Sequence, residues 1–552
     1  MSKSTFFVLA LILTGAFLRF YNLNWGAPFY FHPDERNVID LVLKSSLTNP
    51  ESLLKGTFAY GNFPVILTLL LKPLLLPFFQ IYNLTDPFAQ TAVTLRFVSA
   101  IFSVLTLYVI YLCGKFWSQK VALLALFLAV FSTGLIQQAH FGTYDGFGAF
   151  CTITIFYFLL KFLKTKVVIN YYFAFLFIAF GAAAKINLLV LAIFPIIILF
   201  TGFKKHKNRF MQIFKHSALG VILLISSTIL LSPNYLTPEF IKALLYERGL
   251  VAGTTPVFYT QSFYDTTPIV FQFIHILPFL INPLLTIILI PAFLYVFYKG
   301  VKTKNLSFLI LNSFFLILFL PQAFLHAKWT RYMVPTLPFI YLIVAFALER
   351  FYSSSEQSES RSSNSAIQQF SNLFGSRQAR TVLTAVILLI NIIFAVSYLI
   401  TAFVRSDTRI EASNFAQSSI PPAATTLTEP YDLGIMPFNS YISSITPFNF
   451  YDLDLGNNEM EEELRTKLEQ ADYIILPSQR LLRSRLSNPK KFPKGHAFYT
   501  RLSNETLGFQ KIYETPCDIF CKITYLGRPV FGFEETASVF DRPTVLIFKK
   551  IQ

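Results

Sequence analysis

Charged residues are scarce in this sequence. Asp, Glu, Lys and Arg make up only 14% of its 552 residues, whereas soluble proteins carry about 25%. Hydrophobic residues reach 54%, and the mean hydropathy is +0.53. The shortage of charge excludes an ordinary soluble enzyme, and the excess of apolar residues indicates a membrane protein.

Acidic residues are scarce in one part of the chain only. Residues 1–404 contain 29 basic and 12 acidic side chains, whereas residues 405–552 contain 17 basic and 18 acidic ones, at the density of a soluble domain. We therefore expect a membrane domain over 1–404 and a soluble domain over 405–552. The net charge of +16 comes from Lys and Arg that flank apolar runs, so it indicates orientation in a bilayer and predicts no nucleic-acid partner.

Cysteine is also rare. Four cysteines are too few for a disulfide scaffold. Cys113 and Cys151 lie in or at the ends of apolar runs, where a thiol behaves as a small hydrophobic group. Cys517 and Cys521 lie four residues apart in the polar tail, where they can form a disulfide in an oxidising compartment or remain two thiols.

Long apolar runs dominate the first 404 residues. A helix needs about 20 apolar residues to cross the hydrocarbon layer, with every backbone group paired inside the segment. The run from Tyr60 to Phe79 contains three prolines and Lys72, so we expect a helical hairpin on the outer surface there. About eleven other runs are expected to span, and they begin near Thr5, Thr91, Lys120, Gly146, Asn170, Ile186, Ser217, Ile269, Leu306, Met333 and Thr381.

The loops between these runs differ in their content of Lys and Arg. With a cytoplasmic N-terminus, the basic residues gather in inner loops near 115–120, 161–166, 204–215 and 299–304. An odd number of spans then places the C-terminal domain outside. The sequence thus predicts a multi-pass protein of the cell (plasma or inner) membrane, with an extracytoplasmic C-terminal domain. The Ser-rich loop 349–380 is interpreted as a linker.

The polar tail shows short elements of both kinds. Glu459–Gln470 is typical of a helix, whereas Tyr473–Leu476 and Thr544–Phe548 are typical of strands. The expected fold is therefore a polytopic α-helical membrane body of about eleven spans, with a juxtamembrane hairpin in the first outer loop and a C-terminal α/β or α+β domain.

The first outer loop carries the densest set of ionisable groups, Phe31–Arg36. Asp34 and Glu35 lie next to a membrane boundary and among aromatic residues, where a partly shielded carboxylate is a candidate general base. The alternative is a helix start, with Pro33 in the first position and the two acids favoured by the helix dipole. Both readings are compatible, because a helix start would fix the direction of the carboxylate.

The second outer loop, His140–Gly146, contains the acid Asp145. Asp145 can simply cap the following helix, and it can also contribute to a site. The acids of the two outer loops, together with His32 and His140, could bind a divalent metal, although ligands spread over loops give no diagnostic spacing.

Three cations lie where apolar neighbours make them costly. Lys185 stands inside the apolar stretch 171–200, where an ionisable group is by default a candidate functional residue. Lys328 and Arg331 belong to the last short outer loop. Arg331 can bind a phosphate through its forked donors, or both side chains can reach to lipid headgroups. Acids beside cations suit transfer of a group from a phosphate leaving group.

Five motifs of the membrane part resemble, in order, those of GT-C glycosyltransferases, in the branch of protein O-mannosyltransferases and lipid A aminoarabinose transferases, and especially bacterial phospholipid-carrier-dependent glycosyltransferases. They are Phe31-His32-Pro33-Asp34-Glu35, Tyr60-Gly61-Asn62-Phe63-Pro64, His140 to Asp145, Gly181 to Asn187 and Arg331-Tyr332-Met333-Val334-Pro335. The tail resembles a domain appended to some bacterial members, in Asp407-Thr408-Arg409, Glu429-Pro430-Tyr431-Asp432, Ala471-Asp472-Tyr473 and Leu507-Gly508-Phe509.

The resemblance implies a polyprenyl-phosphate sugar donor in the bilayer, an acceptor that is a protein, lipid or glycan, and an active site on the outer face. Asp34 would be the catalytic loop acid, Glu35 its companion and Asp145 the acid of the second outer loop. Lys185, Arg331 and Lys328 are the candidates for binding the donor phosphate. The expected reaction is a single inverting displacement with Asp34 as general base.

Two other functions stay open at this point. A transporter or flippase for lipid-linked saccharides could use the same acids and cations to bind a headgroup, although the charges gather in outer loops and no clear internal repeat is present. An oligosaccharyltransferase or glycan ligase with a lipid-pyrophosphate donor would share the architecture.

Overall fold

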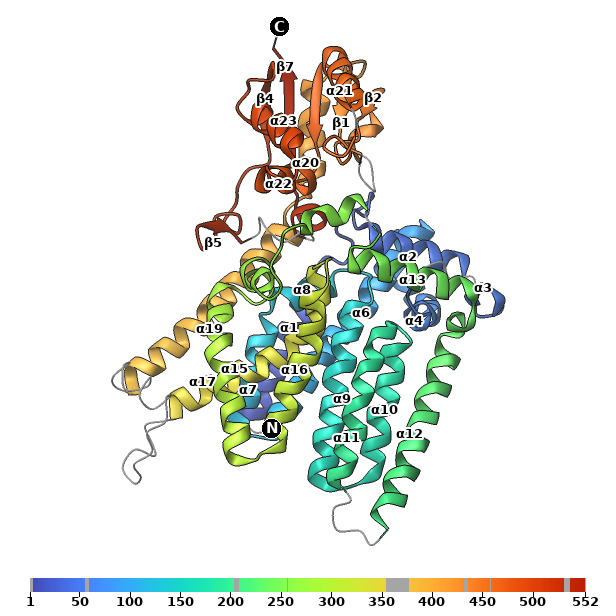
Figure 1. Cartoon of the computed structure of the whole chain (residues 1–552), viewed down its shortest axis with the longest axis vertical. Coiled ribbons are helices and arrows are strands. Elements are labelled where there is room, and N and C mark those ends of the chain that lie inside the picture. The colour runs from blue at the N-terminus through green and yellow to red at the C-terminus, as the bar shows by residue number, and fades with distance from the viewer. Residues whose placement is uncertain are drawn as a thin grey trace.

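The computed structural model describes residues 3–54, 59–202, 208–255, 257–353, 377–430, 435–456, 458–530 and 537–551. A bundle of long helices carries a smaller domain of strands and helices at one end (Figure 1). Within the described residues, eight helices are long and apolar enough to span a membrane, or nine if one bent pair is counted as one span. The predicted fold class, a polytopic helical membrane protein with a C-terminal α/β or α+β domain, is confirmed.

Each predicted span corresponds to a helical segment, with one displacement. The run expected from Ile269 is broken at Asn282, whose side chain accepts a hydrogen bond from the Leu285 amide and so begins the next helix. Three segments are shorter apolar helices, namely Ser4–Phe20, Val168–Ala182 and Ile186–Thr201. The segments of the bundle are α1 (Lys3–Phe20), α6 (Pro87–Gly114), α7 (Gln119–Val130), α8 (Thr133–Ala139), α9 (Asp145–Thr165), α10 (Val168–Ala182), η2 (Ile186–Ala192), α11 (Ile193–Gly202), α12 (Arg209–Leu231), η5 (Gln272–Ile276), α14 (Leu277–Leu280), α15 (Pro283–Thr303), α16 (Leu306–Phe324), η6 (Thr330–Thr336), α17 (Leu337–Ser353), α19 (Arg377–Leu399) and η7 (Ile400–Val404).

Helices α7 and α8 form the bent pair, with an angle of 57° between them. The break frees carbonyl groups at the end of α7, which would be costly in an apolar environment. Arg19, fully buried, donates to the carbonyls of Ala129 (2.9 Å) and Val130 (3.1 Å) and so satisfies them. Ser132 starts α8 by accepting from the Leu135 amide.

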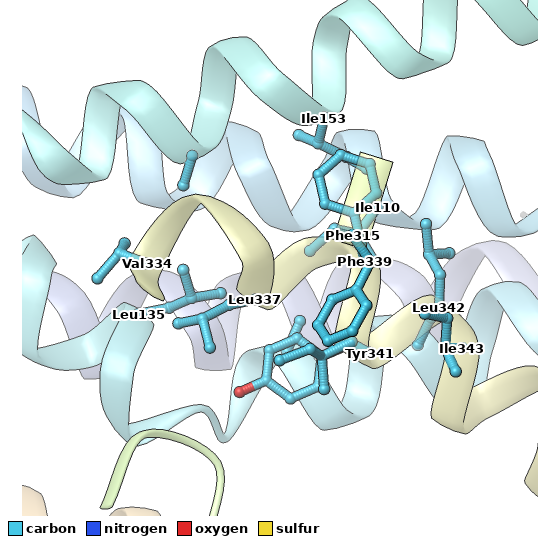
Figure 2. Packing of buried hydrophobic residues seen from close by; sticks show 14 of the residues in the cluster. Ile110, Leu135, Ile153, Phe315, Val334, Leu337, Phe339, Tyr341, Leu342 and Ile343 are labelled. Carbon is cyan, nitrogen blue, oxygen red and sulfur yellow. The ribbon is translucent and has the colours of Figure 1, made fainter. Parts of the chain in front are cut away.

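Helix α17 forms the centre of the bundle. Of the apolar window within Thr330–Tyr352, 83% is buried. Figure 2 shows Phe339 and Tyr341 packed among aliphatic side chains such as Leu135 and Leu337. This packing holds the preceding segment η6, which carries Arg331, against α8 and α9.

The first outer loop is helical. It contains α2 (Pro33–Lys44), α3 (Glu51–Leu54), α4 (Phe63–Leu71), η1 (Lys72–Leu75) and α5 (Leu76–Ile81). Where a hairpin was expected, Phe63–Ile81 is one helical segment with a 3-10 turn at Pro73, packed against α6. By length and composition it also qualifies as a span. In Figure 1, α4 lies beside α2 and near α13 (Pro238–Ala252), at the end of the bundle next to the C-terminal domain.

The C-terminal domain contains a five-stranded mixed sheet in the order β2-β1-β3-β7-β4. Strands β1, β2 and β3 are parallel, whereas β7 runs antiparallel to both β3 and β4, with Ile474 opposite Phe548. The predicted helix and both predicted strands are present as α21, β3 and β7. The elements are α20 (Thr408–Ser419), β1 (Thr425–Thr428), β2 (Ser444–Pro447), α21 (Asn458–Gln470), β3 (Tyr473–Leu476), α22 (Arg480–Ser487), α23 (Pro493–Ser503), β4 (Phe509–Glu514), β5 (Thr524–Tyr525), β6 (Arg528–Pro529), η9 (Ala537–Asp541) and β7 (Leu546–Lys550).

Two segments of the C-terminal domain insert into the top of the bundle. Cys517 and Cys521 are joined by a disulfide, and Phe520 between them packs on Phe394 and Tyr398 of α19. Asp541 of η9 accepts hydrogen bonds from Tyr398 (2.6 Å) and from Gln137 (2.7 Å) of α8. Most of the expected linker 349–380, and residues 431–432 of one tail motif, lie outside the described residues.

Candidate active site

Helix α2 fixes the directions of two neighbouring acids. His32 is its N-cap residue and accepts from the Glu35 amide at 3.4 Å, and Pro33 takes the first helical position. The expected helix start is therefore present. Consecutive residues of a helix point about 100° apart, so Asp34 faces a cavity while Glu35 faces the protein interior.

Glu35 forms a fully buried ion pair with Arg96 of α6. The guanidinium donates twice to the carboxylate, at 2.7 and 2.6 Å, and both side chains have no exposed surface. Glu35 also accepts from the Gly142 amide at 2.8 Å, and a Cβ atom at Gly142 would lie only 2.8 Å from the same oxygen. Arg96 donates further to the carbonyls of Leu23 and Trp25. Glu35 thus connects the first outer loop, α6 and the second outer loop.

Asp34 forms an ion pair with Arg331 of η6, although the two residues are 297 positions apart. Their side chains are 33% and 19% exposed, respectively, and both line a cavity of about 950 Å³. The Arg331 guanidinium lies 4.9 Å from the ring centre of Trp329, and within the described part of the protein its buried Nε has no hydrogen-bond partner. Arg331 therefore keeps one donor for a further group.

Asp145 and Lys185 form a second ion pair, at 2.5 Å, and both side chains are nearly buried. Tyr144, and not Asp145, is the N-cap residue of α9, so the capping alternative does not describe Asp145. The Lys185 ammonium lies 5.3 Å from the ring centre of Tyr60, which lines the 950 Å³ cavity, and 6.0 Å from that of Tyr332. The Asp145–Lys185 pair therefore lies behind Tyr60, one layer of side chains away from this cavity.

Lys328 lies elsewhere. Its ammonium donates to the carbonyls of Leu325 (2.7 Å) and His326 (3.2 Å), and burial lowers its pKa. It lines a different cavity, which α22 also borders, so the structure does not bring Lys328 together with Asp34 and Arg331.

The two histidines considered for a metal are packed against aromatic rings. His32 lies between Phe141 and Phe540, and its pKa is lowered well below the usual value by burial and then by nearby arginines, Arg331 first. His140 contacts the carbonyls of Ile136 and Tyr21, both at 2.8 Å. Among the described residues, no group of three or more His, Cys, Asp or Glu side chains is placed to hold a metal ion.

Several residues of the site were not predicted. Arg96 had a signal, since it is a charged residue inside an apolar run. Glu247 of α13 also lines the cavity; burial raises the pKa of its carboxyl, and Lys185 opposes the rise. Arg480 and Phe540 of the C-terminal domain complete the wall, and no local pattern marks them.

Residues 72–231 match the family model of dolichyl-phosphate-mannose-protein mannosyltransferases. A search of curated protein sequences finds no match.

Similar solved structures cover most of the chain. The apo oligosaccharyltransferase of Archaeoglobus fulgidus matches with a TM-score of 0.50 and 12% identity, over 99% of this chain and 88% of that one. The same enzyme tethered to an acceptor peptide matches with a TM-score of 0.50 and 13% identity, over 98% and 88%. ArnT from Cupriavidus metallidurans, bound to undecaprenyl phosphate, matches with a TM-score of 0.50 and 12% identity, over 87% and 93%. At such identities the likeness is one of fold.

Proposed function

We propose that this chain, a polytopic membrane protein with the GT-C glycosyltransferase fold, transfers a sugar from a polyprenyl-phosphate donor to an acceptor hydroxyl. The observation that carries the proposal is the pairing of Asp34 with Arg331 in one cavity at the boundary between the bundle and the C-terminal domain. A carboxylate and a guanidinium held side by side supply the two groups that such a transfer needs.

The reaction is a single displacement. The acceptor oxygen attacks the anomeric carbon, its proton passes to the Asp34 carboxylate, and the bond between that carbon and the phosphate oxygen breaks. Arg331 binds the departing polyprenyl phosphate with its forked donors. One carboxylate suffices because phosphate, unlike the alkoxide of glycoside hydrolysis, needs no general acid to leave. Attack opposite the leaving group inverts the anomeric configuration.

Donor binding has to open the Asp34–Arg331 pair. The phosphate competes with the carboxylate for the guanidinium, and the Nε of Arg331, which has no hydrogen-bond partner among the described residues, gives it a first contact. Asp34 is then released toward the acceptor. In this scheme Glu35 is a positioning residue that anchors α2 through Arg96, and the Lys185–Asp145 pair supports Tyr60 in the cavity wall.

We assign the site to the extracytoplasmic face of the cell (plasma or inner) membrane. The N-terminus lies at the end of the bundle away from the C-terminal domain (Figure 1), as a cytoplasmic N-terminus and an external domain over 405–552 require. The turns α9–α10 and α15–α16, which carry Lys166 and Lys304, also lie at that far end, as the positive-inside rule predicts. The Cys517–Cys521 disulfide suits an oxidising compartment.

A lipid-pyrophosphate donor is the second candidate, because the fold matches an oligosaccharyltransferase as well as it matches ArnT. Competition between monophosphate- and pyrophosphate-linked sugars for the purified protein decides between them. The monophosphate donor is expected to win, since one guanidinium, that of Arg331, is ion-paired with Asp34 and is released by a single phosphate.

The proposal is tested with Asp34→Asn in purified protein supplied with a panel of undecaprenyl-phosphate sugars. Removal of a general base costs about 10²–10⁴-fold in rate, so sugar release should fall by that factor. Glu51→Gln is the matched control, because Glu51 is an exposed acid of the same outer loop outside the cavity. Turnover of Asp34→Asn at the rate of the control would reject the assigned role.

A further inference from the structure

One segment of the C-terminal domain, Cys517–Val530, lies apart from the five-stranded sheet and beside α19 (Figure 1). We call it the hairpin segment, because the disulfide closes its first loop and the β5–β6 hairpin follows. Phe520 packs on Phe394 and Tyr398 of α19, with ring centres 5.1 and 5.7 Å apart. Val530 is buried in the same hydrophobic cluster as the helices of the bundle.

The contact between Phe520 and α19 lies well before the end of the candidate membrane span. That span, Gln378–Val404, ends ten residues after Phe394, and at 1.5 Å per residue this is about 15 Å along the helix. A span of 27 residues is about 40 Å long, which is the thickness of a bilayer with its headgroup regions. The hairpin segment therefore contacts α19 at the level of the bilayer, although its composition belongs to a soluble domain.

Two large apolar side chains of the hairpin segment are exposed. Ile519 is 72% exposed and Leu526 is 68% exposed. On α19, Ile393 is 52% exposed, as expected for the side of a span that faces lipid. Ile519 precedes Phe520 and Ile393 precedes Phe394, and these two rings are in contact. The apolar surface of the hairpin segment thus adjoins the lipid-facing surface of α19.

Leu526 has a backbone conformation that leucine rarely adopts. Leu526 and Gly527 are the two central residues of the hairpin turn, and their φ angles are 51° and 76°. A turn with two residues in the left-handed region favours Asn, Asp or Gly at both positions, and Asn-Gly above all. In water, Asn at position 526 would suit both the turn and the solvent. An exposed leucine at this tip is accounted for by apolar surroundings.

The backbone of the hairpin segment is paired internally, as the boundary of a bilayer requires, because unpaired polar groups are costly there. The Lys522 amide donates to the Ile519 carbonyl at 3.3 Å. The Ile523 amide donates to the Phe520 carbonyl at 3.1 Å, and the Ile523 carbonyl accepts from the Val530 amide at 2.9 Å. Lys522 is exposed, and its long aliphatic stem lets the ammonium reach the headgroups.

We propose that the hairpin segment anchors the C-terminal domain to the bilayer. It lies in the membrane interface beside α19 and inserts Ile519 and Leu526 among the acyl chains. Amphipathic elements at this boundary bury their apolar side about 5–10 Å deep. The ring of Phe520 and the carboxylate of Asp541 both contact Tyr398, so the anchor holds α19 at the place where η9 docks. The anchor does not depend on the proposed sugar transfer.

The test attaches a spin label to Leu526→Cys in the full chain in phosphatidylcholine nanodiscs. It compares collisions of the label with oxygen, which partitions into lipid, and with a water-soluble nickel chelate. Ile393→Cys on α19 is the lipid reference, and Gln470→Cys, exposed on α21 at the far end of the C-terminal domain, is the water reference (Figure 1). The label at 526 should favour oxygen, as the label at 393 does. A preference for the nickel chelate, or few collisions with both reagents, as a protein partner would cause, overturns the anchor.

A second experiment needs no label on the protein. The nanodiscs contain phosphatidylcholine with a photoreactive acyl chain, and cross-links are mapped by mass spectrometry. Wild-type protein should cross-link within 517–530, and Ile519→Asn/Leu526→Asn should lose most of these cross-links while those on α19 persist. Both side chains are exposed and Asn suits the turn at 526, so folding is not at risk. The matched control, Leu455→Asn, removes another exposed leucine of the same domain and should keep the cross-links. Their absence in the wild type, or equal yields in all three proteins, overturns the anchor.

Discussion

Two acids that are adjacent in the sequence have opposite environments. Asp34 is one-third exposed in a cavity, whereas Glu35 is fully buried against Arg96. The sequence marks both as site candidates, and it cannot separate them because the partner of each is remote in the chain. The buried Glu35–Arg96 pair has a structural role, since it holds α2 in the position in which Asp34 faces Arg331.

Glu35→Gln is expected to destabilise the protein, because it leaves the Arg96 guanidinium buried without a counter-charge. Breaking such a pair costs about 3–5 kcal/mol. Thermal unfolding in detergent should therefore show a clear drop in Tm for Glu35→Gln and little change for Asp34→Asn, whose side chain is partly solvated. A Glu35→Gln protein that unfolds at the wild-type temperature would contradict the anchoring role.

At the scale of elements, the apolar patterns of the sequence predicted most of the helical segments of the bundle. Tyr473–Leu476 is a strand with every residue buried, as its unbroken apolar run indicates. The patterns did not predict where these helical segments break. The bend between α7 and α8 depends on Arg19, which is 110 residues away, and the break before α15 depends on the cap at Asn282. Local periodicity contains neither contact, so it predicts the start of the span near Ile269 too early.

Segment η9 joins the C-terminal domain to the bundle through Asp541. Burial raises the pKa of this carboxyl from 3.8 to about 7, while its hydrogen bonds to Tyr398 and Gln137 oppose the rise. Nearby Arg409 also opposes the rise and Asp407 adds to it. A carboxyl whose pKa is raised by folding stabilises the folded protein most at a pH below its pKa in the unfolded chain. This stabilisation is lost as the pH rises through its pKa in the folded protein.

The pH dependence of Tm tests this junction. The contribution of Asp541 should decline from about pH 4 to about pH 7, so wild-type Tm should fall over that interval. Asp541→Asn keeps an oxygen that can accept from Tyr398 and removes the ionisation, and its Tm should vary less with pH. If Tm varied with pH in the same way for the two proteins, ionisation of Asp541 would not affect the stability of this junction.

At the scale of the whole molecule, the candidate site is built from both bodies. Arg480 and Phe540 of the C-terminal domain close the wall beside Asp34, and Arg485 of the same domain donates to Gln261 of the membrane part at 2.6 Å. Charge counts predicted two bodies, and the motifs predicted Asp34 and Arg331 as residues of one site. The contribution of the C-terminal domain to the cavity was not predictable, because it depends on how the bodies dock.

The orientation of the whole molecule is a prediction from the charge of its loops. The N-terminus and the C-terminal domain lie at opposite ends of the bundle (Figure 1), so which end faces outward is the point to test. A cysteine at Ser440, which is exposed on the C-terminal domain, should react with a membrane-impermeant maleimide in intact cells. Thr303→Cys, at the last residue of α15 and the far end of the bundle, is the matched control and should react only after the cells are opened.

The native cysteines leave a low background for this experiment, because Cys113 and Cys151 are buried and the other two form a disulfide. Labelling at 440 alone places the Asp34 cavity outside, where a polyprenyl-phosphate donor would meet its acceptor. Labelling at 303 alone would invert the molecule and move that cavity to the cytoplasmic face. Labelling at neither position or at both would contradict a fixed orientation with the two ends of the bundle on opposite sides of the membrane.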